Sequence, residues 1–111
     1  MNALRFQASD GKEYTLEFNR ATVADAEDSG LRLDNIDDKM MNNIPILFHY
    51  AFKMHHPSIT KEETDHILFE EFHGLTADEL KQLIELYSEP YGSLINIEGE
   101  EKNLRRVKIL K

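Results

Sequence analysis

Two short stretches near the start of the chain alternate between apolar and polar side chains. An apolar residue recurs at every second position, first at Leu4, Phe6 and Ala8 and then at Tyr14, Leu16 and Phe18. This period of two is typical of β-strands, and the sequence "SDGK" between the stretches is typical of a turn. The pattern therefore predicts an N-terminal β-hairpin.

The register of this hairpin depends on its loop. A two-residue Asp-Gly loop would place apolar side chains opposite polar ones on the same face. A three-residue loop that ends at Gly11, with this glycine in the left-handed conformation of a bulge, pairs Phe6 with Tyr14 and Leu4 with Leu16. We predict the three-residue loop, because it makes one face wholly apolar. Two strands are marginally stable alone, so that face must lie on helices or on a neighbouring chain.

Residues 20–43 give weaker signals. The pattern predicts a short helix from about Thr22 to Ser29, with Gly30 as its left-handed stop. The segment after it is ambiguous. Leu31, Leu33 and Ile36 can anchor an extended connector across the core, and Asp37 can begin a weak helical turn that breaks before Pro45.

The segment 44–54 is apolar on nearly every side. Pro45 suits the first turn of a helix, where its missing N–H has no cost, and Pro57 prevents the helix from continuing. A helix without a polar face is buried on several sides. We therefore expect a central helix here.

Two capping boxes mark the starts of the next helices. Thr60 and Glu63 form the first box, before a helix that ends at Gly74, and Thr76 and Glu79 form the second, before an amphipathic helix that runs to about Ser88. Pro90 and Gly92 interrupt the pattern, although one more packed turn can follow, formed by Tyr91, Leu94 and Ile95.

These elements predict a mainly α fold with an N-terminal β-hairpin (α+β), built as a small bundle of about four helices. We expect one buried cluster between the helices. Its members are Phe48, Ala51, Phe52, Leu68, Phe72, Leu80, Ile84 and Tyr87.

Composition divides the chain into two parts. Eight basic against eighteen acidic residues give −10 over residues 1–95, whereas five against three give +2 over residues 96–111. We expect a single hairpin-plus-helical domain over residues 1–95 and a basic C-terminal tail over residues 96–111. A flexible tail is one form that this segment can take. The acidic domain opposes binding to a phosphate backbone, so we expect protein partners and no nucleic acid.

The sequence has neither a signal-peptide pattern nor an apolar run of about 20 residues, so we expect no contact with a membrane. It has no cysteine, which excludes disulfides and thiolate metal sites. A cytoplasmic location is the expectation that follows.

Histidines gather in "LFHYAFKMHHP", but their spacing does not predict a metal site. His55 and His56 point in different directions, and His66 and His73 are about two helical turns apart. We interpret His49 as a helix-face residue, and His55 and His56 as residues suited to the exposed carbonyl groups at a helix end. The acidic runs lack the spacing of a calcium loop. We therefore predict no catalytic residue, no cofactor site and no metal site, and no enzyme activity.

The order of four motifs resembles the small tail assembly chaperones of long-tailed phages and prophages. They are the hairpin exit at Asn19-Arg20, the pair Ala26-Glu27, the helix end "HHP", and the helix start "G-L-T-x-x-E-L" in "HGLTADEL". The resemblance covers residues 4–95. It implies a non-enzymatic protein of the bacterial host cytoplasm that binds and coats the tape measure protein before tail tube polymerisation. Other partners that it implies are the major tail protein and further copies of the chain.

For this binding we expect apolar side chains of the hairpin and of the tail to make the contacts. They are Leu4, Phe6, Tyr14, Leu16, Leu104, Val107 and Ile109. The charge also permits a function of another class, an acidic protein-binding regulator or nucleic-acid mimic that occupies the DNA site of a host protein.

Overall fold

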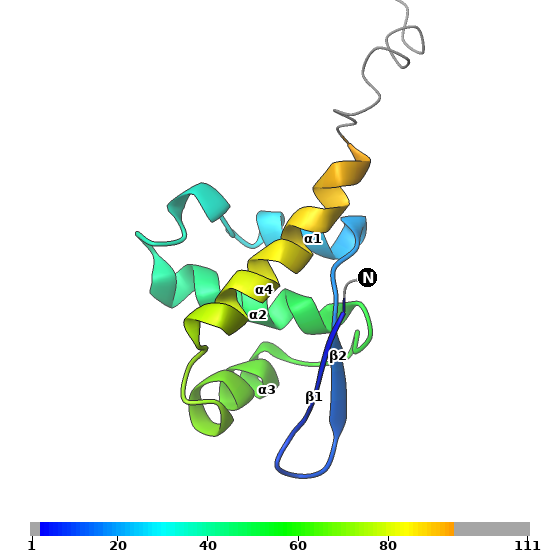
Figure 1. The fold of residues 1–111 in the computed structure, drawn as a ribbon, viewed down its shortest axis with the longest axis vertical. Coiled ribbons are helices and arrows are strands. Elements are labelled where there is room, and N and C mark those ends of the chain that lie inside the picture. Colours follow the sequence, from blue (N-terminus) through cyan, green and yellow to red (C-terminus); the bar gives the residue numbers. More distant parts are fainter. Residues whose placement is uncertain (1–2, 95–111) are drawn as a thin grey trace, which may run out of the picture.

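The computed structural model describes residues 3–94 of the chain (Figure 1). An antiparallel hairpin precedes four α-helices, which confirms the predicted α+β class. In chain order the elements are β1 (Leu4–Gln7), β2 (Glu13–Leu16), α1 (Arg20–Asp28), the 3₁₀ turn η1 (Leu33–Asn35), α2 (Met40–Lys53), α3 (Lys61–His66), the π-helical turn η2 (Ile67–Glu71), α4 (Ala77–Ser88) and the 3₁₀ turn η3 (Glu89–Ser93).

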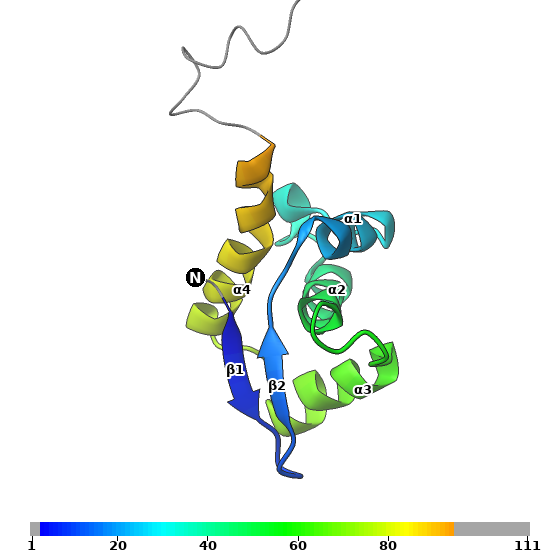
Figure 2. The ribbon, with the colours of Figure 1, turned by 90° about the vertical axis from the view of Figure 1, so that its right-hand side faces the viewer.

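Helix α2 lies at the centre, in contact with α1, α3, α4 and β2. Figure 2 shows α4 on one side of the hairpin and α2 with α3 on the other. The end of η3 and the hairpin loop lie at opposite ends of the described chain (Figures 1 and 2). None of the helices between residues 3 and 94 is long and apolar enough to cross a bilayer.

The hairpin has the predicted register. Phe6 pairs with Tyr14 and Leu4 pairs with Leu16, and Gly11 has a φ of +91°. The Gly11 N–H donates to the carbonyl of Ala8 at 2.9 Å, which closes the three-residue loop. The local pattern was therefore sufficient to predict this element.

The apolar face of the hairpin packs on helices of its own chain. The Phe6 ring lies 5.9 Å from that of Phe52 and 5.0 Å from that of Phe72, and Tyr14 lies 5.2 Å from Phe52, between ring centroids. Leu16 is buried. Of the two arrangements left open by the sequence, the structure has the one in which the hairpin covers its own helices.

The outer edge of β2 is covered by α2 and the residues after it. The Thr15 N–H donates to Nε2 of His56 at 3.1 Å, and the Glu17 N–H donates to the carbonyl of Ala51 at 2.9 Å. His55 Nε2 lies 2.8 Å from Oε1 of Glu17. The two histidines thus bind the hairpin, rather than the carbonyl groups at the helix end as predicted.

Helix α1 begins two residues before its predicted start. Asn19 is the N-cap: its Oδ1 accepts from the Thr22 N–H at 2.8 Å, and the Asn19 N–H donates to the Thr22 hydroxyl at 2.9 Å. Thr22 is therefore the third helical residue of a capping box and not the first. The predicted stop is confirmed, because Gly30 has a φ of +105°.

Helix α2 also begins earlier than expected, at Met40, so the prediction of a break before Pro45 was wrong. Pro45 lies inside the helix and removes only the hydrogen bond to the carbonyl of Met41. Met41 is 80% exposed. Pro45 itself is buried, so the helix gains the burial of its ring where it loses this bond.

Both predicted capping boxes are present. The backbone N–H of Thr60 donates to Glu63 Oε1 at 2.9 Å, and that of Thr76 donates to Glu79 Oε1 at 2.8 Å. Between them, α3 continues as the π-helical turn η2, which ends at Glu71, three residues before the predicted stop at Gly74. Gly74 has a φ of +95° and lies in the turn that follows. Helix α4 ends at Ser88, as predicted.

The core contains the predicted cluster, although not every member is fully buried. Five members are buried: Phe48, Ala51, Phe52, Leu68 and Tyr87. Three are half-buried and pack against it: Phe72, Leu80 and Ile84. Further buried members that the prediction did not include are Leu16, Phe18, Val23, Ala26, Leu31, Leu47, Ile67, Leu83 and Leu86.

Two histidines make the stability of this fold sensitive to pH. His49 is buried, with Nδ1 3.0 Å from the Thr64 hydroxyl. That hydroxyl donates to the carbonyl of Lys61, so it accepts from His49. Burial, together with nearby Lys53 and Lys61, lowers the pKa of His49 below its ordinary value of 6.5. Burial and the neighbouring His55 lower the pKa of His56 in the same way.

The fold should therefore lose stability as the pH falls below neutrality. Both histidines have a lower pKa in the folded chain than in the unfolded chain. When the pH falls below about 6.5, the unfolded chain therefore binds more protons than the folded chain. The stabilisation is complete above this value and disappears as the pH falls through the lower pKa values of the folded state. His56→Gln retains an acceptor for the Thr15 N–H without titrating, so it should reduce the drop in melting temperature between about pH 7.5 and 5. An unchanged drop would exclude His56 as a source.

Candidate protein-binding surface

Exposed apolar side chains surround a groove of about 440 Å³ at one end of the helical layer. We call it the methionine groove. It lies between the N-terminal turn of α2, the turn η2 and the N-terminal turn of α4. The residues that line it are Met40, Met41, Ile44, Pro45, Leu68, Phe69, Gly74, Leu75, Thr76, Ala77 and Leu80.

The local fold explains why these side chains are exposed. The early start of α2 places Met40 and Met41 on a helix end that projects beyond the core, and they are 47% and 80% exposed. In η2, Ile67 and Leu68 face inward while Phe69 is 45% exposed. Methionine side chains are flexible and polarisable and adapt to different apolar partners. Clustered exposed apolar side chains are typical of binding surfaces.

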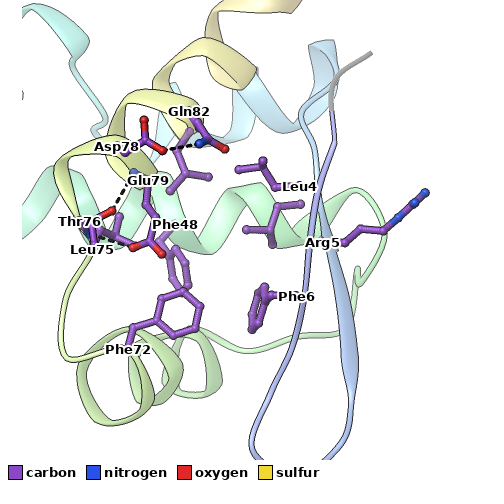
Figure 3. A pocket seen from close by; sticks show the side chains of 12 residues that line it. Leu4, Arg5, Phe6, Phe48, Phe72, Leu75, Thr76, Asp78, Glu79 and Gln82 are labelled. Atoms are coloured by element: carbon purple, nitrogen blue, oxygen red, sulfur yellow. Dashed lines mark hydrogen bonds between the residues drawn. The ribbon is translucent and has the colours of Figure 1, made fainter.

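A second groove, of about 380 Å³, lies between β1 and α4, and we call it the β1 groove. In Figure 3, Leu4 and Phe6 point from β1 toward Phe48 and Phe72, whereas Arg5 points away. The residues that line it are Leu4, Arg5, Phe6, Leu16, Phe48, Phe72, Leu75, Thr76, Asp78, Glu79, Gln82 and Leu83.

The rim of the β1 groove on α4 is polar and acidic. Glu79 belongs to the capping box with Thr76, and Gln82 donates to Oδ2 of Asp78 at 2.7 Å (Figure 3). The groove therefore combines an apolar floor with carboxylates along one wall. The two grooves share Leu75 and Thr76, so they lie on either side of the turn that leads into α4.

The backbone of β1 presents an open edge. In an antiparallel pair, alternate residues direct their N–H and C=O groups away from the partner strand. The bond from the Ala8 N–H to the carbonyl of Lys12, at 2.8 Å, sets this alternation, so Arg5 and Gln7 direct their backbone groups outward. Within residues 3–94 no other segment forms a backbone hydrogen bond with these outward groups. Among the residues that the structure describes, the β2 edge is covered, whereas the β1 edge is not.

The structure distributes the predicted binding residues among different places. Leu4, Phe6 and Leu16 line the β1 groove. Tyr14 packs on the rings of Phe52 and His56 and does not line it. The three tail residues lie outside the described residues: Leu104, Val107 and Ile109.

Sequence reasoning missed the methionine groove. The adjacent Met40 and Met41 lie in a segment whose pattern is ambiguous, and the periodicity around Phe69 predicts only the inward face of its helix. A pair of methionines just before an apolar helix was the available signal.

Hydrogen bonds among two phenols and a carboxylate link the last turn of the described chain to α1. Tyr91 donates to Glu27, which joins η3 to α1, and this bond raises the pKa of Tyr91. Burial and its hydrogen bond to Tyr91 raise the pKa of Tyr87. Both phenols therefore remain protonated at neutral pH. Between residues 3 and 94, no group of three or more His, Asp or Glu side chains is arranged to hold a metal ion.

Comparison with protein families gives one result. The model of a family described as "Domain of unknown function (DUF5055)" matches residues 1–109. The match therefore extends through most of the predicted tail. No curated protein and no solved structure matches the chain in these comparisons.

Proposed function

We propose that this chain, which belongs to the family of the domain of unknown function DUF5055, is a phage tail assembly chaperone. In this proposal it binds and coats the tape measure protein in the bacterial cytoplasm before the tail tube polymerises. The partner is taken from the resemblance of the motif order, and the contact surface is taken from the structure.

The observation that carries the proposal is the methionine groove. A tape measure protein is long and helical, and an amphipathic helix binds by placing its apolar stripe in a hydrophobic groove. Met40, Met41 and Phe69 offer exposed apolar area at the edge of such a groove. A set of adaptable side chains suits a coat protein, because successive sites along a tape measure protein differ in sequence.

The charge around the groove indicates the polar side of such a helix. Exposed acidic residues stand next to groove residues in the chain: Asp38 precedes α2, Glu70 follows Phe69, and Asp78 follows Ala77. Lys39 is a basic residue among them. A helix with basic residues beside its apolar stripe would therefore be favoured over an acidic one.

The four motifs that carry the resemblance have structural roles in this fold. Asn19 caps α1, Ala26 is fully buried, and the "HHP" end of α2 holds β2 through His56. The "G-L-T-x-x-E-L" motif forms the capping box of α4. The motifs thus support a shared fold, and the proposal of a shared partner depends on the groove.

The test is binding to helical fragments of the tape measure protein encoded with this chain. Met41→Asp and Phe69→Asp should each weaken binding at least about tenfold, because each places a charge in the apolar contact. Leu94→Asp is the matched control, because it introduces the same charge at an exposed apolar residue. Leu94 directly follows η3, beyond the C-terminal end of α4, whereas the methionine groove lies at the N-terminal turn of α4, so this variant should bind like the unchanged chain. Equal binding by all four proteins would reject the methionine groove as the contact.

The same assay separates the second class of function. A regulator or nucleic-acid mimic should not bind the tape measure fragments. It should bind a basic DNA-binding domain, with an affinity that falls steeply as the salt concentration rises. Contact through the methionine groove should instead persist at about 0.5 M salt, because apolar burial is screened little.

A further inference from the structure

The open edge of β1 is a place where another strand can be added. Arg5 and Gln7 direct backbone donors and acceptors outward, and the β1 groove lies beside them with an apolar floor. An extended segment on a free edge gains main-chain hydrogen bonds, and alternate side chains reach the floor. The edge therefore favours an extended segment as its occupant.

The C-terminal part of the sequence has the composition that this site favours. In "RRVKILK", Val107 and Ile109 alternate with the basic residues Arg106 and Lys108. A β-branched pair at a spacing of two can face an apolar floor while its neighbours face away. Residues 96–111 carry +2 and residues 1–95 carry −10, so the charges of the segment and the domain are complementary.

We propose that the segment 107–111 of a second copy of the chain adds to β1 as an antiparallel strand. The register that fits best places Ile109 beside Phe6, Val107 beside Ala8 and Leu110 beside Arg5. This register buries Ile109 against the floor. It also places the neutral Leu110, and not Lys108, directly opposite Arg5.

Charged partners for the segment are also present in this register. Arg106 falls beside Ser9. The Ser9 N–H donates to Oε1 of Glu71 at 3.0 Å, so the carboxylate of Glu71 lies close to the position of Arg106. Lys111 falls beside Leu4, which lines the β1 groove together with Asp78 of α4. Both ends of the added strand therefore approach an acid.

The direction of the added strand favours a second copy over the same chain. An antiparallel strand must arrive from the hairpin-loop end of β1, whereas residue 94 lies at the opposite end of the described chain (Figure 2). The chain's own tail would reach the Leu4 end first and pair parallel to β1, unless residues 95–106 passed the strand and turned back. A second copy can pair antiparallel without this reversal, and parallel pairing is slightly less stable. Contact between copies is independent of the proposed tape measure binding, which uses the other groove.

Single cysteines provide the sharpest test, since the chain has none of its own. We would mix full-length Arg5→Cys and Leu110→Cys chains and allow disulfides to form. Directly opposed residues of an antiparallel pair lie about 5.5 Å apart, within disulfide range. A mixed dimer should form at least about tenfold faster than with Asp25→Cys, an exposed control on α1, because the segment holds the two sulfurs together.

A chain that carries both Arg5→Cys and Leu110→Cys identifies the alternative. If it forms a disulfide within one chain at high dilution while the mixture gives no mixed dimer, the segment occupies its own edge and the proposal is wrong. Equal rates for the Arg5→Cys and Asp25→Cys mixtures would also overturn it.

The mass in solution is an independent readout. Sedimentation of the full chain should show self-association that Ile109→Asp weakens about tenfold or more, because it places a charge on the apolar floor. Ile97→Asp makes the same change earlier in the sequence and should leave the association unchanged. If Ile109→Asp associates as the unchanged chain does, the segment is not the contact. Because no tape measure fragment is present, this result is separate from the test of the proposed function.

Discussion

Replacing Phe52 with alanine should lower the free energy of unfolding by about 3 to 5 kcal/mol. Phe52 is fully buried, and its ring lies 5.0 Å from that of Phe48 and 5.2 Å from that of Tyr14, between centroids. Truncation removes contacts with both the central helix and the hairpin, so the cavity cannot be closed by the movement of one element alone. Urea unfolding followed by circular dichroism measures the loss.

Phe69→Ala is the matched control, because it removes the same ring from an exposed site. Phe69 is 45% exposed, so its truncation should cost less than about 1 kcal/mol. If Phe52→Ala also costs less than about 1 kcal/mol, Phe52 does not belong to the core that we describe. The pair of variants also separates the residues that stabilise the fold from those proposed to bind a partner.

Elements with a local cause were predictable from the sequence. The hairpin register followed from the spacing of apolar residues around Gly11, and both capping boxes followed from a threonine and a glutamate three residues apart. In each case, the residues that determine the structure lie within a few positions of one another. No distant contact was needed to choose between alternatives.

Features that depend on tertiary contacts were not predictable in the same way. Helix α2 starts at Met40 and therefore contains Pro45, although proline is unfavourable inside a helix. The burial of the following apolar residues by four neighbouring elements outweighs this local preference. Pairing of His56 with Thr15 joins segments 41 residues apart. The grooves share this origin, since each is bounded by elements that are distant in sequence.

The candidate site shows the same division. Leu4, Phe6 and Leu16 were selected because their spacing makes one face apolar, and they do line a groove. The sequence did not show that β2 would be covered and β1 left open, because that difference depends on where α2 ends. The methionine groove likewise requires α2, η2 and α4 to be placed together.

Phe6→Asp should destabilise the fold by at least about 3 kcal/mol, a large part of the stability of a domain of this size. Phe6 is half-buried against the rings of Tyr14, Phe52 and Phe72. An aspartate at this position loses these contacts. It also places a carboxylate against three aromatic rings, none of which can neutralise its charge. Thermal and urea unfolding at low protein concentration measure the effect on the single chain.

Arg5→Asp is the control that makes this result specific. Arg5 is the next residue of the same strand, but it is exposed and points away from the β1 groove. Its replacement should change stability by no more than about 0.5 kcal/mol. If Phe6→Asp leaves the chain folded and as stable as Arg5→Asp, the hairpin face is not part of the core. In that case Phe6 would be free to contact another protein, as the alternative derived from the sequence allowed.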